Sequence, residues 1–193
     1  MRPASLISTA LVLACVVGLG GYLGGRLFFA PPVVVETGSP WVETQWPFLR
    51  DGWPKGRAFR CGVADCGEEV LFFARIKLGL CDCTVGIADD EDLERVSDVS
   101  LIAPKVEADA PGQGKAFAGM QGWTRSFHAP NGAPVVLVGG GRNCNAFVGM
   151  ASARSALSPA ALRALDSLLN GPQMSRWISS AQGLPKARPA VSH

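Results

Sequence analysis

The chain has 193 residues, enough for one domain of ordinary size and too few for two large ones. Hydrophobic residues make up 48% of it and charged residues only 18%, which excludes a disordered chain or a coiled coil as a description of the whole. Its formal charge of +2 gives no electrostatic case for nucleic acid as a partner.

The first predicted element is a membrane anchor. Residues 3–25 carry no charge and lie between Arg2 and Arg26. As a helix, this stretch is long enough to span the roughly 30 Å hydrocarbon core of a bilayer, whereas the apolar region of a cleavable signal peptide has only about 7–15 residues. We therefore expect a retained single transmembrane helix, a signal-anchor, within residues 1–30.

Two further interpretations concern this anchor. Cys15 and the residues before it loosely resemble a lipoprotein processing site, although the apolar run continues for ten residues beyond Cys15. Gly20 with Gly24, and Gly21 with Gly25, have the spacing at which small residues let two membrane helices approach closely. These pairs raise the hypothesis of a homo-oligomer that forms through the anchor.

The orientation follows from the short N-terminal tail. The simplest arrangement leaves this tail in the cytoplasm and exports everything after about residue 30, because long domains translocate with little regard to charge. Five cysteines lie beyond the anchor, which suits an oxidising compartment. We expect the C-terminal domain on the periplasmic or extracellular side of the membrane.

Residues 31–56 are rich in proline and tryptophan. Proline restricts its own φ and the residue before it, so this segment is predicted to be an extended connector rather than a helix. Its three tryptophans, Trp41, Trp46 and Trp53, suit either the bilayer interface or a strap that packs on the domain surface.

An exported domain is expected over residues 57–182, and its clearest strand covers residues 70–78. Apolar side chains alternate along this strand, with the period of two that places them on one face. They are Val70, Phe72, Ala74, Ile76 and Leu78. The opposite face becomes polar only toward its end, at Arg75 and Lys77.

The acidic run Asp89–Asp92 opens a short predicted helix that includes Leu93 and Val96, because acidic side chains in a first turn complement the helix dipole. Calcium is the alternative reading of these carboxylates, but the spaced pattern of an EF-hand is missing.

Further strands are predicted over residues 117–128, 133–138 and 146–150. The turn residues 130–132, Pro-Asn-Gly, separate the first two of these strands, and Gly139–Gly141 are expected to end the second. An anion-binding loop is the alternative for these three glycines and the arginine after them, but such a loop leads into a helix, whereas a strand follows here.

The C-terminal part is predicted to be helical. Ser158 is the expected N-cap and Pro159 the first residue of a helix that ends at Gly171. Its apolar side is expected to be Leu162, Leu165, Leu168 and Leu169. A shorter helix is predicted over residues 172–181, followed by a flexible tail, residues 183–193. Strands followed by helices predict an α+β domain with an antiparallel sheet.

The cysteines allow two interpretations. In the first, Cys61, Cys66, Cys81, Cys83 and Cys144 are the candidates for structural disulfides. Cys81 and Cys83 do not bond to each other in this interpretation, because a ring closed over one intervening residue is strained, and the connectivity stays open. Since the number of exported cysteines is odd, one of them is left without a partner in the chain, which marks either a bridge to another chain or a reactive thiol.

In the second interpretation, four thiolates hold a metal or a cluster: Cys61, Cys66, Cys81 and Cys83. Their spacing, C-x4-C and C-x-C, matches the usual zinc pattern poorly, whereas a C-x-C pair is suited to Cu(I). We favour the disulfides, and with them no cofactor.

Signals for catalysis are weak. His128 is the histidine on which an acid–base mechanism would have to rest, and the sequence places no spaced acidic partner near it. The serines lack the G-x-S-x-G and S-x-x-K settings of activated nucleophiles. The sequence therefore favours a protein that is not an enzyme.

The charge is divided along the chain. Residues 61–109 carry four basic and twelve acidic side chains, a net charge of −8, whereas residues 110–193 carry eight basic side chains and one acidic, a net charge of +7. We expect these charges to be satisfied within the domain, the alternative being complementary faces for neighbouring molecules.

Together these features predict a single-pass membrane protein whose exported, disulfide-stabilised domain acts as a non-catalytic accessory, assembly or interaction subunit. Its expected partners are the membrane and another membrane or exported protein. The alternative is a membrane-tethered thiol protein that binds or delivers copper or zinc through its C-x-C and C-x4-C pairs.

Overall fold

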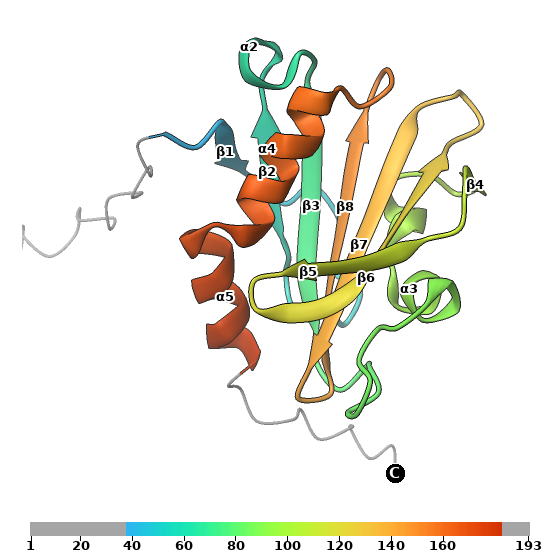
Figure 1. Cartoon of the computed structure of the whole chain (residues 1–193), viewed down its shortest axis with the longest axis vertical. Helices are drawn as coiled ribbons and strands as arrows, with labels where there is room; N and C mark the ends of the chain where they lie inside the picture. Colours follow the sequence, from blue (N-terminus) through green and yellow to red (C-terminus); the bar gives the residue numbers. More distant parts are fainter. Residues whose placement is uncertain (1–37, 183–193) are drawn as a thin grey trace, which may run out of the picture. The chain divides into compact units, whose positions relative to one another are not determined.

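The computed structural model describes residues 38–182. Within them, eight strands form one sheet in which every pairing is antiparallel. The strand order is β1-β2-β3-β8-β7-β6-β4, and β5 pairs with β6 outside this path (Figure 1). The predicted α+β class, with an antiparallel sheet and C-terminal helices, is confirmed.

The strands are β1 (Trp41–Thr44), β2 (Arg57–Cys61), β3 (Val70–Lys77), β4 (Glu107–Ala108), β5 (Gln113–Phe117), β6 (Met120–His128), β7 (Pro134–Arg142) and β8 (Asn145–Ala153). The helices are α2 (Val63–Cys66), α3 (Asp90–Val96), the short 3₁₀ helix η1 (Val99–Leu101), α4 (Pro159–Asn170) and α5 (Pro172–Gln182).

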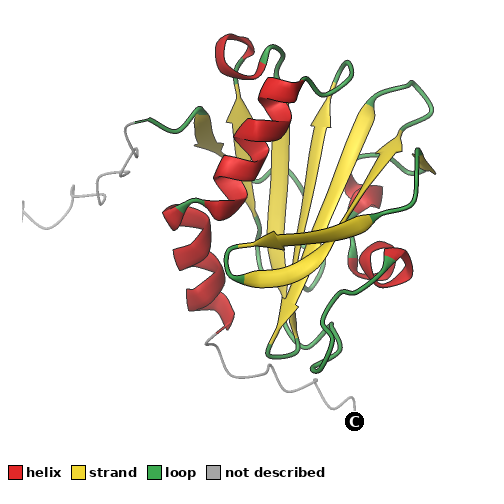
Figure 2. Cartoon of the chain, in the orientation of Figure 1, coloured by secondary structure: helices red, strands yellow, loops and turns green. Residues whose placement is uncertain are grey.

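Each face of the sheet has its own apolar core. Helices α4 and α5 cover one face, which we call the α4 face (Figure 2). Its largest fully buried side chains include Phe59, Phe72, Phe147, Leu169 and Met174. The opposite face, the α3 face, buries a second cluster beneath α3 and the loops beside it; this cluster includes Ile87, Leu93, Leu137 and Met150.

Strand β3 contributes to both cores. Phe72 and Ile76 point into the core of the α4 face, and Phe73 belongs to that of the α3 face, as the period of two predicts. The polar end of the strand is buried as well: Arg75 is 3% exposed and Lys77 is 5% exposed. The α3 face of β3 is therefore covered at its polar end as well.

Part of the proline- and tryptophan-rich segment belongs to the sheet. Strand β1 pairs with β2, and Trp41 is buried on the α4 face, where its indole N–H donates to the carbonyl of Ala164 at 2.8 Å. Trp46 packs edge-on against Phe73 on the other face, with ring centroids 6.3 Å apart. Both tryptophans therefore pack on the domain, as the strap interpretation expects.

Two of the predicted strand boundaries are wrong. Residues 117–128 do not form one strand, because a two-residue turn at Ala118 and Gly119 separates β5 from β6. Both turn residues have positive φ, 48° and 71°, as the tight turns of β-hairpins require. The Pro-Asn-Gly turn at residues 130–132 is confirmed, since the Gly132 N–H donates to the Ala129 carbonyl at 2.8 Å.

The three glycines do not end a strand. Gly139, Gly140 and Gly141 lie within β7, and the turn comes later, at Asn143 and Cys144, with φ of 53° and 62°. The glycines are needed for close packing against three different segments. A Cβ on Gly139 would lie 2.7 Å from the side chain of Leu93, one on Gly140 2.8 Å from Phe117, and one on Gly141 2.9 Å from the sulfur of Cys81.

The helix predictions are confirmed with one correction. The Ser158 hydroxyl caps α4 by accepting from the Ala161 N–H at 3.0 Å, with Pro159 at the first helical position. Leu162, expected on the buried side, is instead 46% exposed, and Ala161 takes the buried position in that turn. In α3, the Asp89 carboxylate is the N-cap, accepting from the Asp92 N–H at 2.8 Å.

None of the helices within residues 38–182 is long and apolar enough to cross a bilayer. The predicted anchor, residues 1–30, lies outside the described residues, together with Cys15 and the glycine pairs. The predicted tail, residues 183–193, lies outside them too.

Candidate functional site

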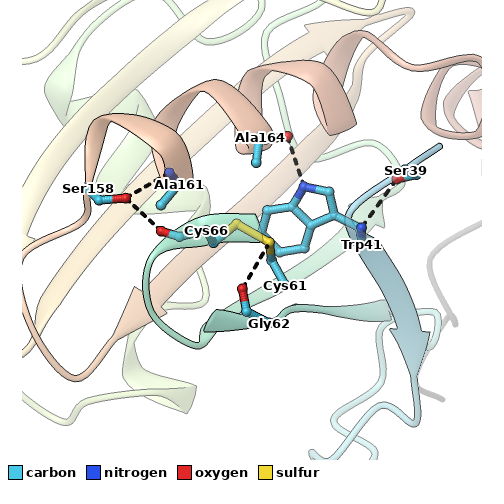
Figure 3. The surroundings of a disulfide bond; sticks show 8 residues. All are labelled: Ser39, Trp41, Cys61, Gly62, Cys66, Ser158, Ala161 and Ala164. Atoms are coloured by element: carbon cyan, nitrogen blue, oxygen red, sulfur yellow. Dashed lines mark hydrogen bonds between the residues drawn. A yellow bond between two sulfur atoms is a disulfide. The ribbon is translucent and has the colours of Figure 1, made fainter. Parts of the chain in front are cut away.

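The first disulfide joins Cys61 and Cys66 and closes a short loop that contains α2. Both cysteines are fully buried on the α4 face (Figure 3). Cys61 lies opposite Trp41 in the β1–β2 register. The Cys66 carbonyl accepts from the Ser158 hydroxyl at 2.6 Å, so this loop is tied to the start of α4. The arrangement is that of a structural crosslink.

The second disulfide joins Cys83 to Cys144, across 61 positions of the chain. It connects the loop after β3 to the turn between β7 and β8. Cys83 is exposed, whereas Cys81 in the same loop is a free, buried thiol. Burial raises the pKa of the Cys81 thiol above its ordinary value, against the hydrogen bonds that its sulfur accepts from backbone N–H groups.

The proposed four-cysteine metal set is therefore divided between the two ends of β3. Cys61 is paired with Val70 at the start of the strand, and Cys81 follows its end at Lys77. The first and last Cα atoms of this eight-residue strand are about 23 Å apart, at roughly 3.3 Å for each step from one residue to the next. Within residues 38–182, no group of three or more His, Cys, Asp or Glu side chains has an arrangement that could hold a metal ion.

Sequence reasoning missed a buried cluster of charges on the α3 face. The Arg75 guanidinium donates to Asp98 through two nitrogens and to both carboxylate oxygens of Asp51, at 2.7 and 2.8 Å. The Lys77 ammonium lies 2.7 Å from an Asp98 oxygen and donates to the Val96 carbonyl at 2.8 Å. Two cations and two carboxylates balance one another.

The pKa values in this cluster follow from those contacts. The hydrogen bond from Arg75 lowers the pKa of Asp51 to about 2. Burial lowers the pKa of the Arg75 guanidinium, but the hydrogen bonds to Asp98 and Asp51 outweigh this effect and raise it above its ordinary value. Asp51 and Arg75 therefore stay ionised at neutral pH, which suits a structural clamp.

His128 has acidic partners after all, contrary to the sequence prediction. Its Nδ1 lies 2.6 Å from a carboxylate oxygen of Asp109, and its Nε2 lies 3.6 Å from Glu107. The hydrogen bond with Asp109 raises the pKa of the imidazole. Strand β4 brings these carboxylates to the end of β6, because Glu107 is the register partner of His128. The group is exposed at the sheet edge.

The other polar candidates have structural partners. Asp90, from the acidic run, accepts from the Trp123 indole N–H at 2.7 Å and from the Gly112 N–H at 2.9 Å. Arg142, proposed for an anion site, donates to the carbonyl of Gly119 across the two hairpins. These contacts favour the structural interpretation of both motifs.

The charge division is satisfied in part within the domain. Arg125, from the basic half, forms ion pairs with Asp90, at 3.3 Å, and with Glu94, both from the acidic half. Lys115 instead pairs with Asp166 at 2.6 Å, so both partners come from the basic half.

A surface cleft of about 420 Å³ lies between α4 and the strands β5, β6 and β7. Five of its lining side chains are valines or leucines: Val136, Val138, Leu162, Leu165 and Leu169. The Lys115–Asp166 ion pair lies on its rim, and Thr124 and Ser126 add hydroxyl groups from β6. An apolar floor with polar groups of both signs around it is suited to binding rather than to a specific reaction.

Comparisons of the chain with protein-family models and with curated proteins find no match. The features of the domain that bear on its function are therefore its cleft and its cysteines.

Proposed function

We propose that the protein is a membrane-tethered accessory subunit whose exported, disulfide-stabilised domain binds another membrane or exported protein without catalysing a reaction. The tether is the uncharged segment 3–25, and the domain includes residues 38–182.

The observation that carries the proposal is the pair of disulfides. Disulfides persist in oxidising compartments, and both bonds here connect loops to the sheet rather than approach the cleft. A bond that closes a loop of 61 residues stabilises a small domain by roughly 2–4 kcal/mol. This is what a domain needs when it works outside the cytoplasm at the end of a membrane tether.

The surface that we assign to the partner is the cleft between α4 and β5. Leu162 is 46% exposed on its wall, and β5 pairs through one edge with β6 and through the other with none of the described strands. An extended segment of a partner can lie along such an edge and place apolar side chains on Val136 and Val138. We therefore take the occupant to be an extended segment of a partner protein.

The test has two parts, both on the full chain in its own cells. A C-terminal topology reporter should report the exported side of the membrane. In a mild detergent extract, the protein should migrate in a complex larger than itself, and Leu162→Asp should release it. Leu49→Asp is the matched control, because Leu49 is 91% exposed and does not line the cleft.

Three results would contradict the proposal. A cytoplasmic C-terminus would refute export. A complex that survives Leu162→Asp would refute the cleft as its binding surface, and a complex made only of copies of this chain would replace the second protein by a homo-oligomer.

A further inference from the structure

Three cysteines meet at one end of the sheet, although only two of them are bonded. The Cys81 N–H donates to the carbonyl of Cys144 at 3.4 Å, and the Cys81 sulfur accepts a hydrogen bond from the backbone N–H of Arg142. A Cβ on Gly141 would lie 2.9 Å from the same sulfur. Cys81 thus lies against the turn that carries Cys144, while Cys83 is bonded to Cys144 itself.

This placement puts Cys144 within bonding reach of either cysteine. Cys81 and Cys144 lie outside the strands but share one backbone hydrogen bond. For scale, hydrogen-bonded residues of an antiparallel pair have Cα atoms about 5.5 Å apart, inside the range of about 4.4–6.8 Å that disulfides span. For comparison, the Cα atoms of Cys83 and Cys144 are 4.1 Å apart. Cys81 and Cys83 are separated by Asp82 alone, so both cysteines belong to one loop that contacts the turn carrying Cys144.

We propose that Cys81, Cys83 and Cys144 form a thiol–disulfide exchange site that moves the free thiol from a buried to an exposed position. The Cys81 thiolate attacks the sulfur of Cys144, the Cys81–Cys144 bond forms, the Cys83–Cys144 bond breaks, and Cys83 leaves as a thiolate. The proton lost by Cys81 is replaced by one that Cys83 takes up. One disulfide and one thiol exist before and after, so the step needs no oxidant or reductant.

The exchange would replace a buried free thiol by an exposed one. Cys81 is 7% exposed, whereas Cys83 lies on an exposed loop. Once freed, the Cys83 thiolate can attack a disulfide of an exported protein or a small molecule, which forms a mixed disulfide and releases one thiolate of that substrate. The substrate class of the site is therefore a disulfide.

The loop around Cys83 is held in a defined turn. The Asp82 carboxylate accepts from the N–H groups of Thr84, at 2.6 Å, and Val85, at 3.0 Å. Two charges act on the Cys81 thiol: the Asp82 carboxylate raises its pKa, and Arg95 on α3 lowers it, while burial dominates and raises it. The thiolate that starts the exchange therefore becomes more abundant as the pH rises.

A pair of variants tests the geometry. In full-length Cys83→Ser, purified without reductant, peptide mapping after alkylation should find Cys81 bonded to Cys144. Cys144→Ser is the matched control, in which Cys81 and Cys83 should both be alkylated because a C-x-C ring is strained. Free thiols at Cys81 and Cys144 in the first variant would overturn the proposal.

A second measurement uses the unmodified full chain and does not depend on the folding of a variant. The native protein is treated with dithiodipyridine, an aromatic disulfide, and the labelled cysteine is mapped. We expect the label on Cys83, at a rate that rises about tenfold per pH unit while the attacking thiol is mostly protonated. Cys81→Ser should abolish it. Label confined to Cys81, or none on these three cysteines, would overturn the exchange.

Discussion

The two faces of the sheet bury their apolar side chains under different covers. On the α4 face, two helices pack with aliphatic and aromatic side chains, and the Cys61–Cys66 disulfide lies within that core. On the α3 face, a short helix and loops leave room for Arg75, Lys77 and Asp98, the three buried charged residues of the described chain. The same strand, β3, serves both faces.

The α4 face is therefore stabilised mainly by buried apolar surface area, whereas the α3 face also depends on ion pairs between buried side chains. Apolar contacts tolerate small shifts because they have no direction, whereas each buried charge needs its partner at a fixed distance and angle. On the α3 face, the free energy of unfolding should therefore fall most when one charged partner is removed. On the α4 face, it should fall most when a buried apolar side chain is made smaller.

The largest effect is expected from Asp98→Ala, which leaves Arg75 and Lys77 buried without their shared carboxylate. Loss of one partner of a buried ion pair costs about 3–5 kcal/mol, and urea unfolding of the full chain should show a decrease of this size. Asp166→Ala is the control, because its pair with Lys115 is largely exposed and is worth at most about 1 kcal/mol. Equal losses would remove the distinction between the faces.

The next effect is expected on the α4 face, from Leu169→Ala. Leu169 is fully buried, and truncation of such a leucine leaves a cavity that costs about 3 kcal/mol in the free energy of unfolding. Leu162→Ala removes the same atoms from an exposed position of the same helix and should cost less than about 1 kcal/mol. If the two variants unfold at the same urea concentration, the packing of Leu169 in the core beneath α4 is contradicted.

A smaller effect is expected from Ser158→Ala. The hydroxyl caps α4 and also donates to the Cys66 carbonyl, so its loss should cost about 1 kcal/mol, measured as a shift of the thermal midpoint. Ser167→Ala, at an exposed position of the same helix, should be neutral or slightly stabilising because alanine is the better helix former. A neutral Ser158→Ala would show that the cap does not contribute.

The smallest effect is expected from acid acting on Asp51, whose side chain is 36% exposed. Its pKa is lowered to about 2 in the folded protein, from 3.8, so its contribution to stability is complete above about pH 4 and is lost as the pH falls toward 2. Asp51→Asn should make urea unfolding less dependent on pH in this interval. An unchanged pH profile in this variant would contradict the pairing with Arg75.

The sequence predicts the elements whose signal is local. The alternation along residues 70–78 yields β3, and the Ser-Pro start yields α4, because each depends on neighbouring residues alone. The glycines of β7 mislead, since what they accommodate, Leu93, Phe117 and Cys81, comes from three other segments. From the sequence alone, such glycines predict a turn, because the segments that pack against them are not known.

Among the candidate functional residues, too, the sequence predicts what depends on neighbouring residues and misses what depends on distant ones. Arg75 and Lys77 are visible as the polar end of a strand, but their partner Asp98 is more than 20 positions away and nothing in the spacing connects them. His128 gains its carboxylates only because β4 pairs with the end of β6. The sequence spacing predicts that Cys81 and Cys83 do not bond to each other. That Cys83 bonds to Cys144 instead depends on the turn after β7, which the sequence does not place beside Cys83.

The position of β1 determines how the domain bears mechanical load. If the proposed tether pulls on the chain from its N-terminal side, the first of the described elements under tension is β1, a four-residue edge strand. Force would first strip the β1–β2 ladder and draw the Trp41 indole from Ala164, and would then reach Asp51, held on Arg75 by two hydrogen bonds. Beyond β2, the Cys61–Cys66 bond stops the unravelling of the α2 loop. The domain would thus give way to tension in steps, with its sheet interior the last part to yield.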